Sequence, residues 1–303
     1  MFLGRNNVFR GTLTGILDMV IGENRKVFLS ASARTARFID GKYTFITHRG
    51  GYRFSSLRIK NGAFFSFENA QLKKVPLTLG RLEVNFGATM QGSWLDIKAS
   101  DVIIHSGATV DLSAQGHESD KGPGAGGLHQ SDGTGAGHGG YGGVSTGNFG
   151  TWYGSALNPN NTGSGGGSSS NGKGGRGGGN LRLTVVRVLT LEGTISVKGE
   201  SGTVLNSGGG SGGSIWISAD NIRGNGIINA EGGDGKGAGG GGSGGRVALY
   251  LQELMSFEGL LNAKGGSGKD AGAAGTLYLQ DNNKRILRKR LWIEIGRRRV
   301  GKE

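Results

Sequence analysis

Seven carboxylates in the strand-like parts of the chain are the side chains best suited to catalysis: Asp96, Asp101, Asp111, Glu192, Asp220, Glu231 and Glu258. Cleavage of a polysaccharide needs carboxyl groups, with or without arginine or lysine, projecting together from neighbouring strands. The sequence has no Asp-Asp pair among these acids. Glu192 and Glu258 each precede a glycine at the same point of a repeat, with Asn225 between them, so we expect a structural ladder at a corner.

Two patterns resemble metal sites. The run GGSGKD at 265–270 matches the start of a calcium-binding nonapeptide, but it occurs once and has Gly272 where a large apolar residue is expected. His129, His138 and Tyr141 are separated by glycine, which lacks the rigid support that metal ligands need. We therefore expect no metal site and no bound cofactor.

Aromatic residues in the glycine-rich middle of the chain are better candidates for binding. They are Tyr141, Phe149, Trp152 and Tyr153. Exposed aromatic rings on a rigid scaffold commonly contact sugars or protein partners. The alternative is that these rings fill the flank of the fold. Nearby, Asn160-Asn161-Thr162 is a glycosylation sequon, which makes Asn160 a candidate glycan acceptor and favours an exported protein.

Composition limits the classes of protein that the chain can be. The 303 residues include 65 glycines, three prolines and no cysteine, and 35% are apolar. Without a Gly-X-Y register the chain is not collagen, and without cysteine it has no disulfide or thiolate metal site. The apolar runs between the glycine tracts argue against disorder. No stretch is long and apolar enough to predict a membrane span.

The glycines that interrupt the apolar segments recur with a fixed spacing. Gly193, Gly226 and Gly259 are 33 residues apart, within segments 181–199, 214–232 and 246–265. Earlier turn glycines are expected at Gly62, Gly87 and Gly107, each between short alternating strands. Such a period predicts an all-β, right-handed parallel β-helix with an inward and an outward face on each strand. A β-sandwich is the alternative, although it does not explain the repeated corner glycines.

Long glycine-rich loops are expected on one side of this β-helix. The largest is the insertion 116–180, and shorter ones follow at 199–213, 232–245 and 265–275. Because each leaves its repeat at the same point, stacked repeats would bring them side by side. Glycine-rich backbones can then pack as extended, polyproline-II-like segments.

We predict three parts along the chain. Residues 1–56 form an irregular β cap or the end of a preceding module, with a hairpin at Asp40-Gly41. Residues 57–283 form the parallel β-helix. Residues 284–303 are a basic tail that carries +7 of the net charge of +13. Nucleic-acid binding through this tail is a minor alternative, because a terminal basic run is usually solvated.

The glycine-biased motifs resemble those of glycine-rich β-helical modules in very large extracellular or cell-surface proteins of invertebrates and protists, and tracts in plant glycine-rich proteins. The segments that carry the resemblance are 20–24, 32–38, 55–59, 102–116, 137–143 and 210–217. The resemblance implies a secreted or surface-exposed scaffold and supplies no catalytic residues. The start of the chain is not a signal peptide, so we expect a part of a longer or truncated protein.

The sequence thus predicts a non-catalytic structural or adhesive module, extracellular or at the cell surface. Its expected partners are glycans or matrix proteins, contacted through the glycine-rich loops. The alternative is a β-helical polysaccharide lyase or hydrolase, which would bring three or more charged side chains of adjacent repeats together in a cleft.

Overall fold

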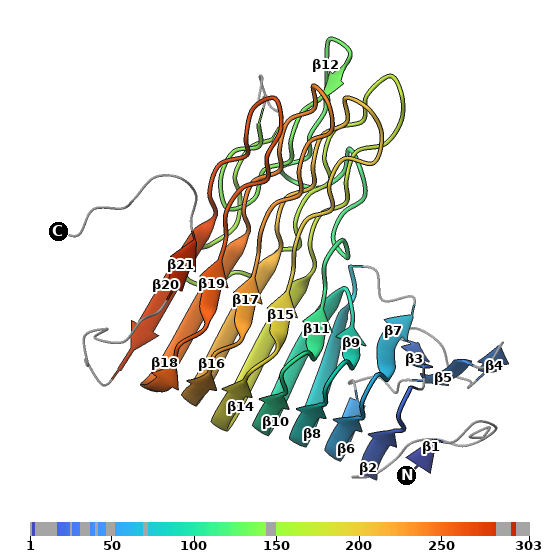
Figure 1. The fold of residues 1–303 in the computed structure, drawn as a ribbon, viewed down its shortest axis with the longest axis vertical. Helices are drawn as coiled ribbons and strands as arrows, with labels where there is room; N and C mark the ends of the chain where they lie inside the picture. Colours follow the sequence, from blue (N-terminus) through green and yellow to red (C-terminus); the bar gives the residue numbers. More distant parts are fainter. Residues whose placement is uncertain are drawn as a thin grey trace.

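The described residues form an all-β fold with two long parallel sheets and no helix (Figure 1). The computed structural model describes residues 2–3, 17–24, 26–30, 37–39, 42–46, 52–68, 72–143, 150–282 and 292–294. Within them, no helix exists that could cross a membrane. The arrangement is compatible with a parallel β-solenoid, as the repeat spacing predicts.

The first sheet, sheet A, contains nine strands that all pair in parallel. In spatial order they are β1 (Phe2–Leu3), β2 (Leu17–Ile21), β6 (Tyr52–Ile59), β8 (Lys74–Val84), β10 (Trp94–Ile104), β14 (Asn180–Leu191), β16 (Ser214–Gly224), β18 (Arg246–Phe257) and β20 (Thr276–Asp281).

The second sheet, sheet B, contains ten shorter strands. In spatial order they are β21 (Trp292–Glu294), β19 (Leu260–Asn262), β17 (Ile227–Asn229), β15 (Thr194–Ser196), β11 (Thr109–Asp111), β9 (Thr89–Gln91), β7 (Phe64–Glu68), β3 (Lys26–Ser30), β5 (Lys42–Ile46) and β4 (Arg37–Ile39). The antiparallel pairing of β4 with β5 confirms the predicted hairpin. A small third sheet pairs β12 (Leu128–His129) with β13 (Asp132–Gly133).

The ends of the stack extend into the predicted cap and tail. In the predicted cap, β2 pairs with β6 and β3 pairs with β7, both in parallel. In the predicted basic tail, β21 pairs with β19, and the rest of that tail lies outside the described residues. The boundaries of the three predicted parts stay a prediction.

Each repeat, or rung, contributes one strand to sheet A and one to sheet B, and their inward side chains form the core. Alternation of period 2 turns every second residue inward. The strict register stacks like residues of successive rungs, as in the column Leu77, Ile97, Leu183, Ile217 and Leu249. All five are at most 2% exposed. Each buried side chain of this kind contributes about 1.5–3 kcal/mol.

The turns that join the two sheets require glycine for two different reasons. Gly62, Gly87 and Gly107 have φ of 66°, 67° and 72°, the left-handed conformation that favours glycine. The later turns at Gly193, Gly226 and Gly259 do not have a left-handed φ. A side chain on Gly226 or Gly259 would instead overlap the backbone oxygen of the preceding turn glycine. Our expectation of a glycine at each corner is confirmed, but only the first three need its backbone freedom.

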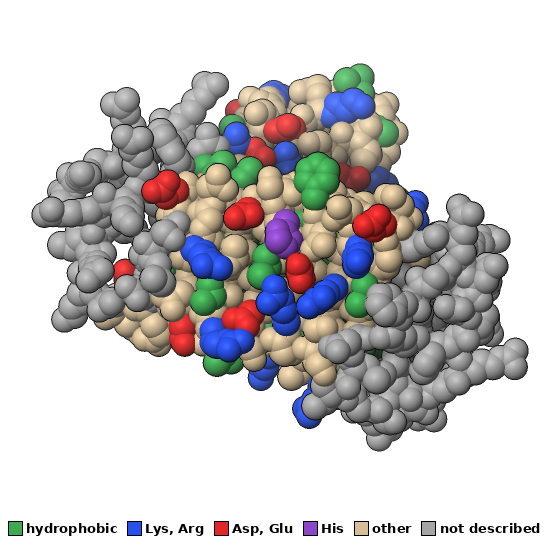
Figure 2. Space-filling view, turned by 60° about the horizontal axis from the view of Figure 1, so that its bottom comes forward, with side chains coloured by type: hydrophobic (Ala, Val, Ile, Leu, Met, Phe, Trp, Pro, Cys, Tyr) green, Lys and Arg blue, Asp and Glu red, His purple; other side chains and the backbone are tan. Residues whose placement is uncertain are grey.

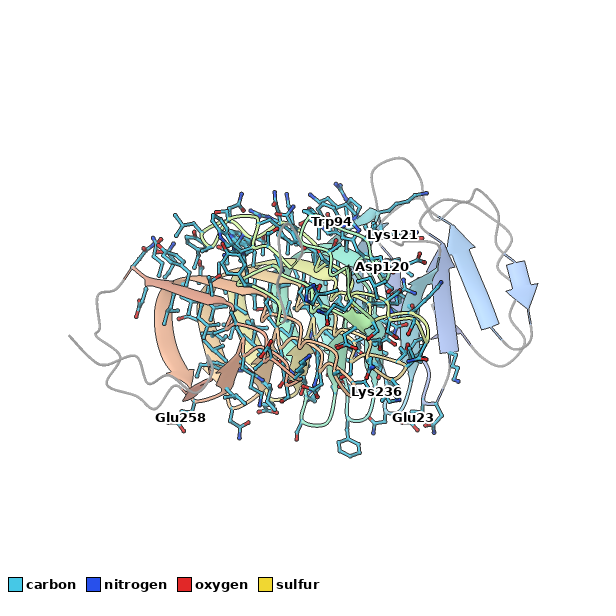
Figure 3. The ribbon with its side chains drawn as sticks, turned by 90° about the horizontal axis from the view of Figure 1, so that it is seen from above. Glu23, Trp94, Asp120, Lys121, Lys236 and Glu258 are labelled. Carbon is cyan, nitrogen blue, oxygen red and sulfur yellow. The ribbon has the colours of Figure 1, made fainter. Side chains whose placement is uncertain are left out.

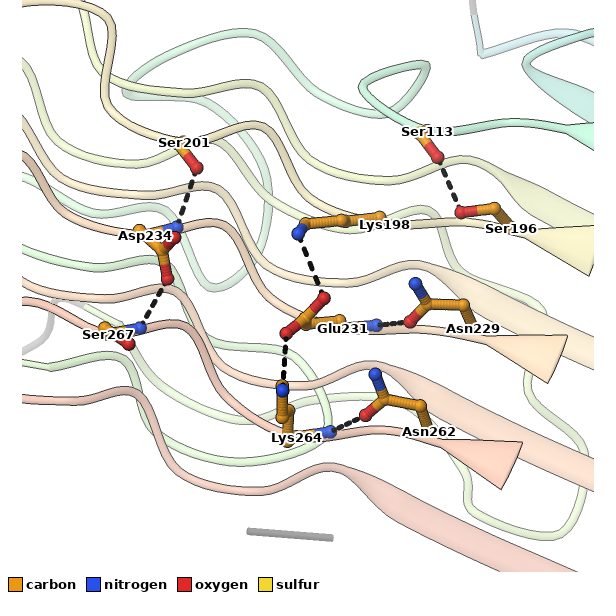
Figure 4. Close-up of polar contacts among 10 residues, drawn as sticks. All are labelled: Ser113, Ser196, Lys198, Ser201, Asn229, Glu231, Asp234, Asn262, Lys264 and Ser267. Atoms are coloured by element: carbon orange, nitrogen blue, oxygen red, sulfur yellow. Dashed lines mark hydrogen bonds and ion pairs between the residues drawn. The ribbon is translucent and has the colours of Figure 1, made fainter. Parts of the chain in front are cut away.

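Polar ladders mark the points where the chain leaves sheet B (Figure 4). The side chains of Asn229 and Asn262 each accept a hydrogen bond, 3.0 Å long, from the backbone N–H two residues later. That residue is Glu231 in one rung and Lys264 in the next. Glu231 also pairs with Lys198 at 2.9 Å and with Lys264 at 3.3 Å. The ladder therefore fixes the same bend in successive rungs.

Beyond this bend, the glycine-rich segments form a packed bundle, which we call the array: residues 116–143, 163–179, 199–213, 230–245 and 263–275. All of them extend from the same end of the sheets (Figure 1). The backbone N–H groups of residues 208, 209 and 210 donate to three different neighbouring segments, and those of residues 211, 212 and 213 donate to the same three segments in the same order. Their acceptors, in order, are the carbonyls of Gly167, Gly240, Glu200, Ser164, Ser243 and Val197.

This period of three residues is the pitch of a polyproline-II-like helix. Residues 240–245 show the same period. The backbone N–H groups of residues 240 and 243 donate to one neighbouring segment, those of 241 and 244 to a second, and those of 242 and 245 to a third. The predicted side-by-side packing of the loops is thereby confirmed. Hydrogen bonds from one segment to several neighbours make the array a three-dimensional network.

Close approach of backbones explains why glycine is needed in the array. A side chain on Gly213 would overlap the carbonyl oxygen of Gly179, one on Gly245 would overlap that of Gly213, and one on Gly275 would overlap that of Gly245. These four glycines form a ladder immediately before β14, β16, β18 and β20. The obstacle is backbone, which cannot move aside as a flexible side chain can.

This packing predicts that Gly245→Ala destabilises the protein more than Gly87→Ala does. At Gly87 the nearest atoms to a new methyl group are 3.7 Å away, so the cost is that of the left-handed φ, about 1–2 kcal/mol. At Gly245 the methyl group would enter backbone, and we expect a loss of at least about 3 kcal/mol. Denaturant unfolding of both variants measures the difference. Equal losses would contradict close backbone packing as the reason for glycine.

Candidate functional site

The outer face of sheet A carries a row of three aromatic side chains, Trp216, Tyr250 and Tyr278, which we call the aromatic strip. In β16, Ile215 and Ile217 point into the core, so Trp216 between them points outward. The rings of Trp216 and Tyr250 are 5.7 Å apart between centroids, and those of Tyr250 and Tyr278 are 5.3 Å apart. All three residues are half-buried, which leaves part of each ring in contact with solvent.

Arg182 closes one end of the strip. Its guanidinium carbon lies 3.6 Å from the centroid of the Trp216 ring, a cation–π contact worth about 0.5–1 kcal/mol near the surface. Its Nη1 donates to Oδ1 of Asn158 at 3.0 Å. Arg182 and Trp216 are register partners on β14 and β16, so strand pairing fixes their separation.

Residues 151–162, which we call the strap, cross the outer face of β14, β16 and β18 beside the strip. Three hydrogen bonds to strap carbonyls hold them there: Arg246 Nε to Tyr153 O at 2.9 Å, Tyr250 Oη to Leu157 O at 2.6 Å, and Ser214 Oγ to Asn161 O at 2.6 Å. Trp152 and Leu157 of the strap remain 57% and 52% exposed. The strap therefore adds exposed apolar side chains next to the aromatic strip.

The structure separates the four aromatic residues predicted from sequence. Trp152 lies exposed on the strap, whereas Tyr141 is 52% exposed within the array, where its carbonyl accepts from Ala273 N. Tyr153 turns inward. Phe149 lies outside the described residues. The predicted glycan acceptor Asn160 is exposed on the strap. The alternation of SIWIS at 214–218 contains the signal for an outward Trp216, which the sequence analysis missed.

Tyr153 connects the strap to a buried polar network of the array. Its ring stacks on that of His138 with 4.6 Å between centroids, and its hydroxyl lies 2.6 Å from Thr162 O and 2.9 Å from Ser164 Oγ. His138 is fully buried and Nδ1 donates to Gly212 O at 2.7 Å. Burial lowers the pKa of His138 to about 4 despite that hydrogen bond, and the nearby Arg246 charge lowers it further. Burial raises the pKa of Tyr153.

Arg246 links this network to the strap and forms no ion pair with a carboxylate of the described residues. The residue is 4% exposed, and its guanidinium donates to three neutral oxygens, those of Tyr153, His138 and Thr276. Burial lowers the pKa of Arg246. The strap therefore rests on a buried cation that is solvated by carbonyl and hydroxyl groups.

The residues considered for a metal site do not converge. His138 lies inside the array, while His129 is on β12 at the tip of the molecule (Figure 1). Among the described residues, no three His, Asp or Glu side chains form a group that could hold a metal ion. The carbonyl of Asp270, in the calcium-like run, accepts from Gly241 N and so takes part in the array.

The predicted corner ladder lines a surface hollow of about 430 Å³. Its lining residues are Thr190, Glu192, Arg223, Gly224, Asn225 and Glu258. Glu192, Arg223 and Glu258 are exposed, and Arg223 Nε donates to Thr190 Oγ1 at 2.9 Å. In Figure 3, Glu258 lies at the face opposite to that of Trp94. Charged groups of both signs are also interspersed around the turn end of the molecule (Figure 2).

Most of the other candidate carboxylates make structural contacts. Asp96 pairs with Lys74 at 2.6 Å, Asp101 pairs with Arg187, and Asp111 accepts from Ser113 N at 2.9 Å. Glu231 pairs with two lysines, as described above. These partners hold the acids on separate rungs and corners.

Comparisons of the chain with protein-family models, with curated proteins and with solved structures found no match. The aromatic strip, the strap and the corner hollow are therefore interpreted from their own geometry and chemistry.

Because His138 is buried, we predict that the free energy of unfolding decreases as the pH is lowered from about 6.5 to about 4. In this range the unfolded chain binds a proton on His138 that the folded protein excludes, so the free energy of unfolding decreases by about 1.4 kcal/mol per pH unit. His117, whose pKa is also lowered by burial, acts in the same direction. Denaturant unfolding at several pH values should show this slope in the parent protein and a smaller slope in His138→Gln. An unchanged slope would contradict the assignment to His138.

Proposed function

We propose that the chain is a non-catalytic structural or adhesive scaffold module of an extracellular or cell-surface protein. In this proposal the parallel sheets form a right-handed β-helix, and the aromatic strip with the adjoining strap binds glycans. The observation that carries the proposal is the row Trp216, Tyr250 and Tyr278, held on neighbouring strands with ring centroids 5.7 and 5.3 Å apart.

The chemistry of the strip suits a sugar chain. Aromatic rings offer flat apolar faces to sugar C–H groups, while nearby polar side chains bond to hydroxyls. Here Arg182 and Asn158 stand at the end of the strip, and Trp152 is exposed on the strap. Because the rings project from paired strands, little conformational entropy is lost when a ligand stacks on them.

A scaffold role is supported by how the rungs are held together. The aliphatic columns, the corner ladders and the array each connect successive rungs, so a force on one rung is shared by its neighbours. The sequon at Asn160, exposed on the strap, and the resemblance to extracellular glycine-rich modules support an extracellular location.

Glycan binding predicts that Trp216→Ala and Tyr278→Ala each weaken binding. We expect at least a tenfold rise in the Kd of any glycan found by array screening, which corresponds to about 1.4 kcal/mol of lost stacking. Phe86→Ala is the matched control, because Phe86 is a 66% exposed aromatic residue at a turn away from the strip. Binding that survives both strip substitutions, or is lost equally in the control, would contradict the proposal.

A polysaccharide hydrolase or lyase is the second candidate function, favoured by the corner hollow. Glu192, Arg223 and Glu258 of three successive rungs line it. We favour the scaffold because both glutamates are exposed and Arg223 is bonded to Thr190.

The two functions differ in whether polysaccharides are cleaved. Acidic and neutral polysaccharides incubated with the protein should yield no new reducing ends and no unsaturated products. If products form, and Glu192→Gln or Glu258→Gln abolishes them, the enzyme replaces the scaffold as the function. Asp220→Asn, at an exposed acid on β16 that does not line the hollow, serves as the control substitution.

A further inference from the structure

The cation at the end of the aromatic strip has no carboxylate partner. Among the described residues, no acid lies within ion-pair distance of Arg182, whose guanidinium bonds only to the neutral Asn158. On the same strand, by contrast, Arg187 pairs with Asp101. Asp96 on β10 is the direct register partner of Arg182, but its Oδ2 lies 2.6 Å from Lys74 and it forms no ion pair with Arg182.

Arg182 keeps hydrogen-bonding capacity beyond its contact with Asn158. A guanidinium has five N–H donors and stays charged at any physiological pH. Toward the described part of the chain, Arg182 uses only the Nη1 bond to Asn158. The contact with Trp216 is a cation–π contact, which leaves the N–H groups along the edge of the guanidinium for acceptors. The fork geometry of that edge matches a carboxylate or a sulfate.

The second arginine near the strip adds positive charge to the same region. Arg246, two strands away on β18, is buried under the strap, and its bonds to described residues all go to neutral oxygens. Buried charges interact through a medium of lower dielectric constant than water, so this charge is screened less than an exposed one. The strip is thus an aromatic surface beside two cations, neither of which forms an ion pair with a carboxylate of the described residues.

We propose that the strip binds acidic glycans, in which sugar rings stack on Tyr250 and Tyr278 and a carboxylate or sulfate group bonds to Arg182. This inference rests on the proposed glycan binding and names the class of glycan. Trp216 positions Arg182 from the neighbouring strand, so the aromatic row and the cation act as one site. A neutral glycan can stack on the tyrosine rings but has no carboxylate or sulfate for Arg182. The site therefore distinguishes acidic glycans from neutral ones.

The experiment compares each acidic polymer with its neutral form. Polygalacturonate and the same polymer after carboxyl reduction form one pair, and a sulfated galactan and its desulfated form are the other. We expect the acidic member of at least one pair to bind at least ten times more tightly, and the pair that responds identifies the acidic group. Titration calorimetry in a buffer of fixed ionic strength gives each Kd.

Charge-matched variants separate the site from the general positive charge of the chain. Arg182→Gln should weaken binding of the acidic polymer at least tenfold and that of the neutral polymer less than threefold, because glutamine keeps an N–H donor for sugar hydroxyls. Arg182→Lys should recover part of the affinity for the acidic polymer. Arg187→Gln removes the same charge from the same strand and should change the Kd less than twofold. Equal losses in Arg182→Gln and Arg187→Gln would overturn the proposal in favour of non-specific attraction.

Other outcomes separate this inference from the function on which it rests. Equal binding of both members of each pair, with no effect of Arg182→Gln, would overturn the acidic class while glycan binding stands. Absence of binding to all polymers and across a glycan array would overturn glycan binding itself. A single-stranded oligonucleotide that binds more tightly than the acidic polymers, and depends on Arg182, would assign the strip to nucleic acid, since stacking and positive charge also suit that ligand.

Discussion

The fold depends on backbones that approach too closely for any side chain to stand between them. In the ladder Gly179, Gly213, Gly245 and Gly275, each glycine after the first faces the carbonyl oxygen of the glycine one rung earlier, and Gly179 itself faces that of Ser93. This contact occurs where the chain passes from the array into sheet A. It therefore fixes how closely successive rungs approach one another at that boundary. Hydrogen bonds to three neighbouring segments then replace the side-chain packing that glycine cannot supply. Such a network satisfies buried backbone groups that would otherwise destabilise the fold.

The array and the sheet face are connected through a few polar residues. His138 enters the array from a glycine-rich segment and bonds to Gly212, while its own carbonyl accepts from Arg246 on β18. Arg246 in turn bonds to Tyr153 at the start of the strap. The position of the strap over sheet A therefore depends on order inside the array. Loss of array packing is expected to disturb the binding surface even though the two share no exposed residue.

The parts of the fold that depend on local repeats could be predicted from sequence. The period of 33 residues located the strands and the turn at Gly226, and alternation around Asp40-Gly41 located the hairpin of β4 and β5. The candidate site was harder to predict, because Arg182, Trp216 and Tyr250 belong to three rungs and meet only through strand register. Tyr153 has the composition and context of an exposed loop aromatic. It turns inward because the array provides a partner ring at His138, which no local pattern reveals.

The composition of the array also determines where a ligand can be recognised. A bundle of glycine backbones whose hydrogen bonds are internally satisfied offers few side chains to a partner, so specific contacts must come from segments that contain other residues. The strap, TWYGSALNPNNT, has a single glycine in twelve residues, and the array holds it against the outer face of sheet A. That placement brings Trp152, Leu157 and Asn158 beside side chains from β14, β16 and β18. Glycine-rich packing and side-chain recognition are thereby divided between two regions, and the binding surface forms where those regions meet.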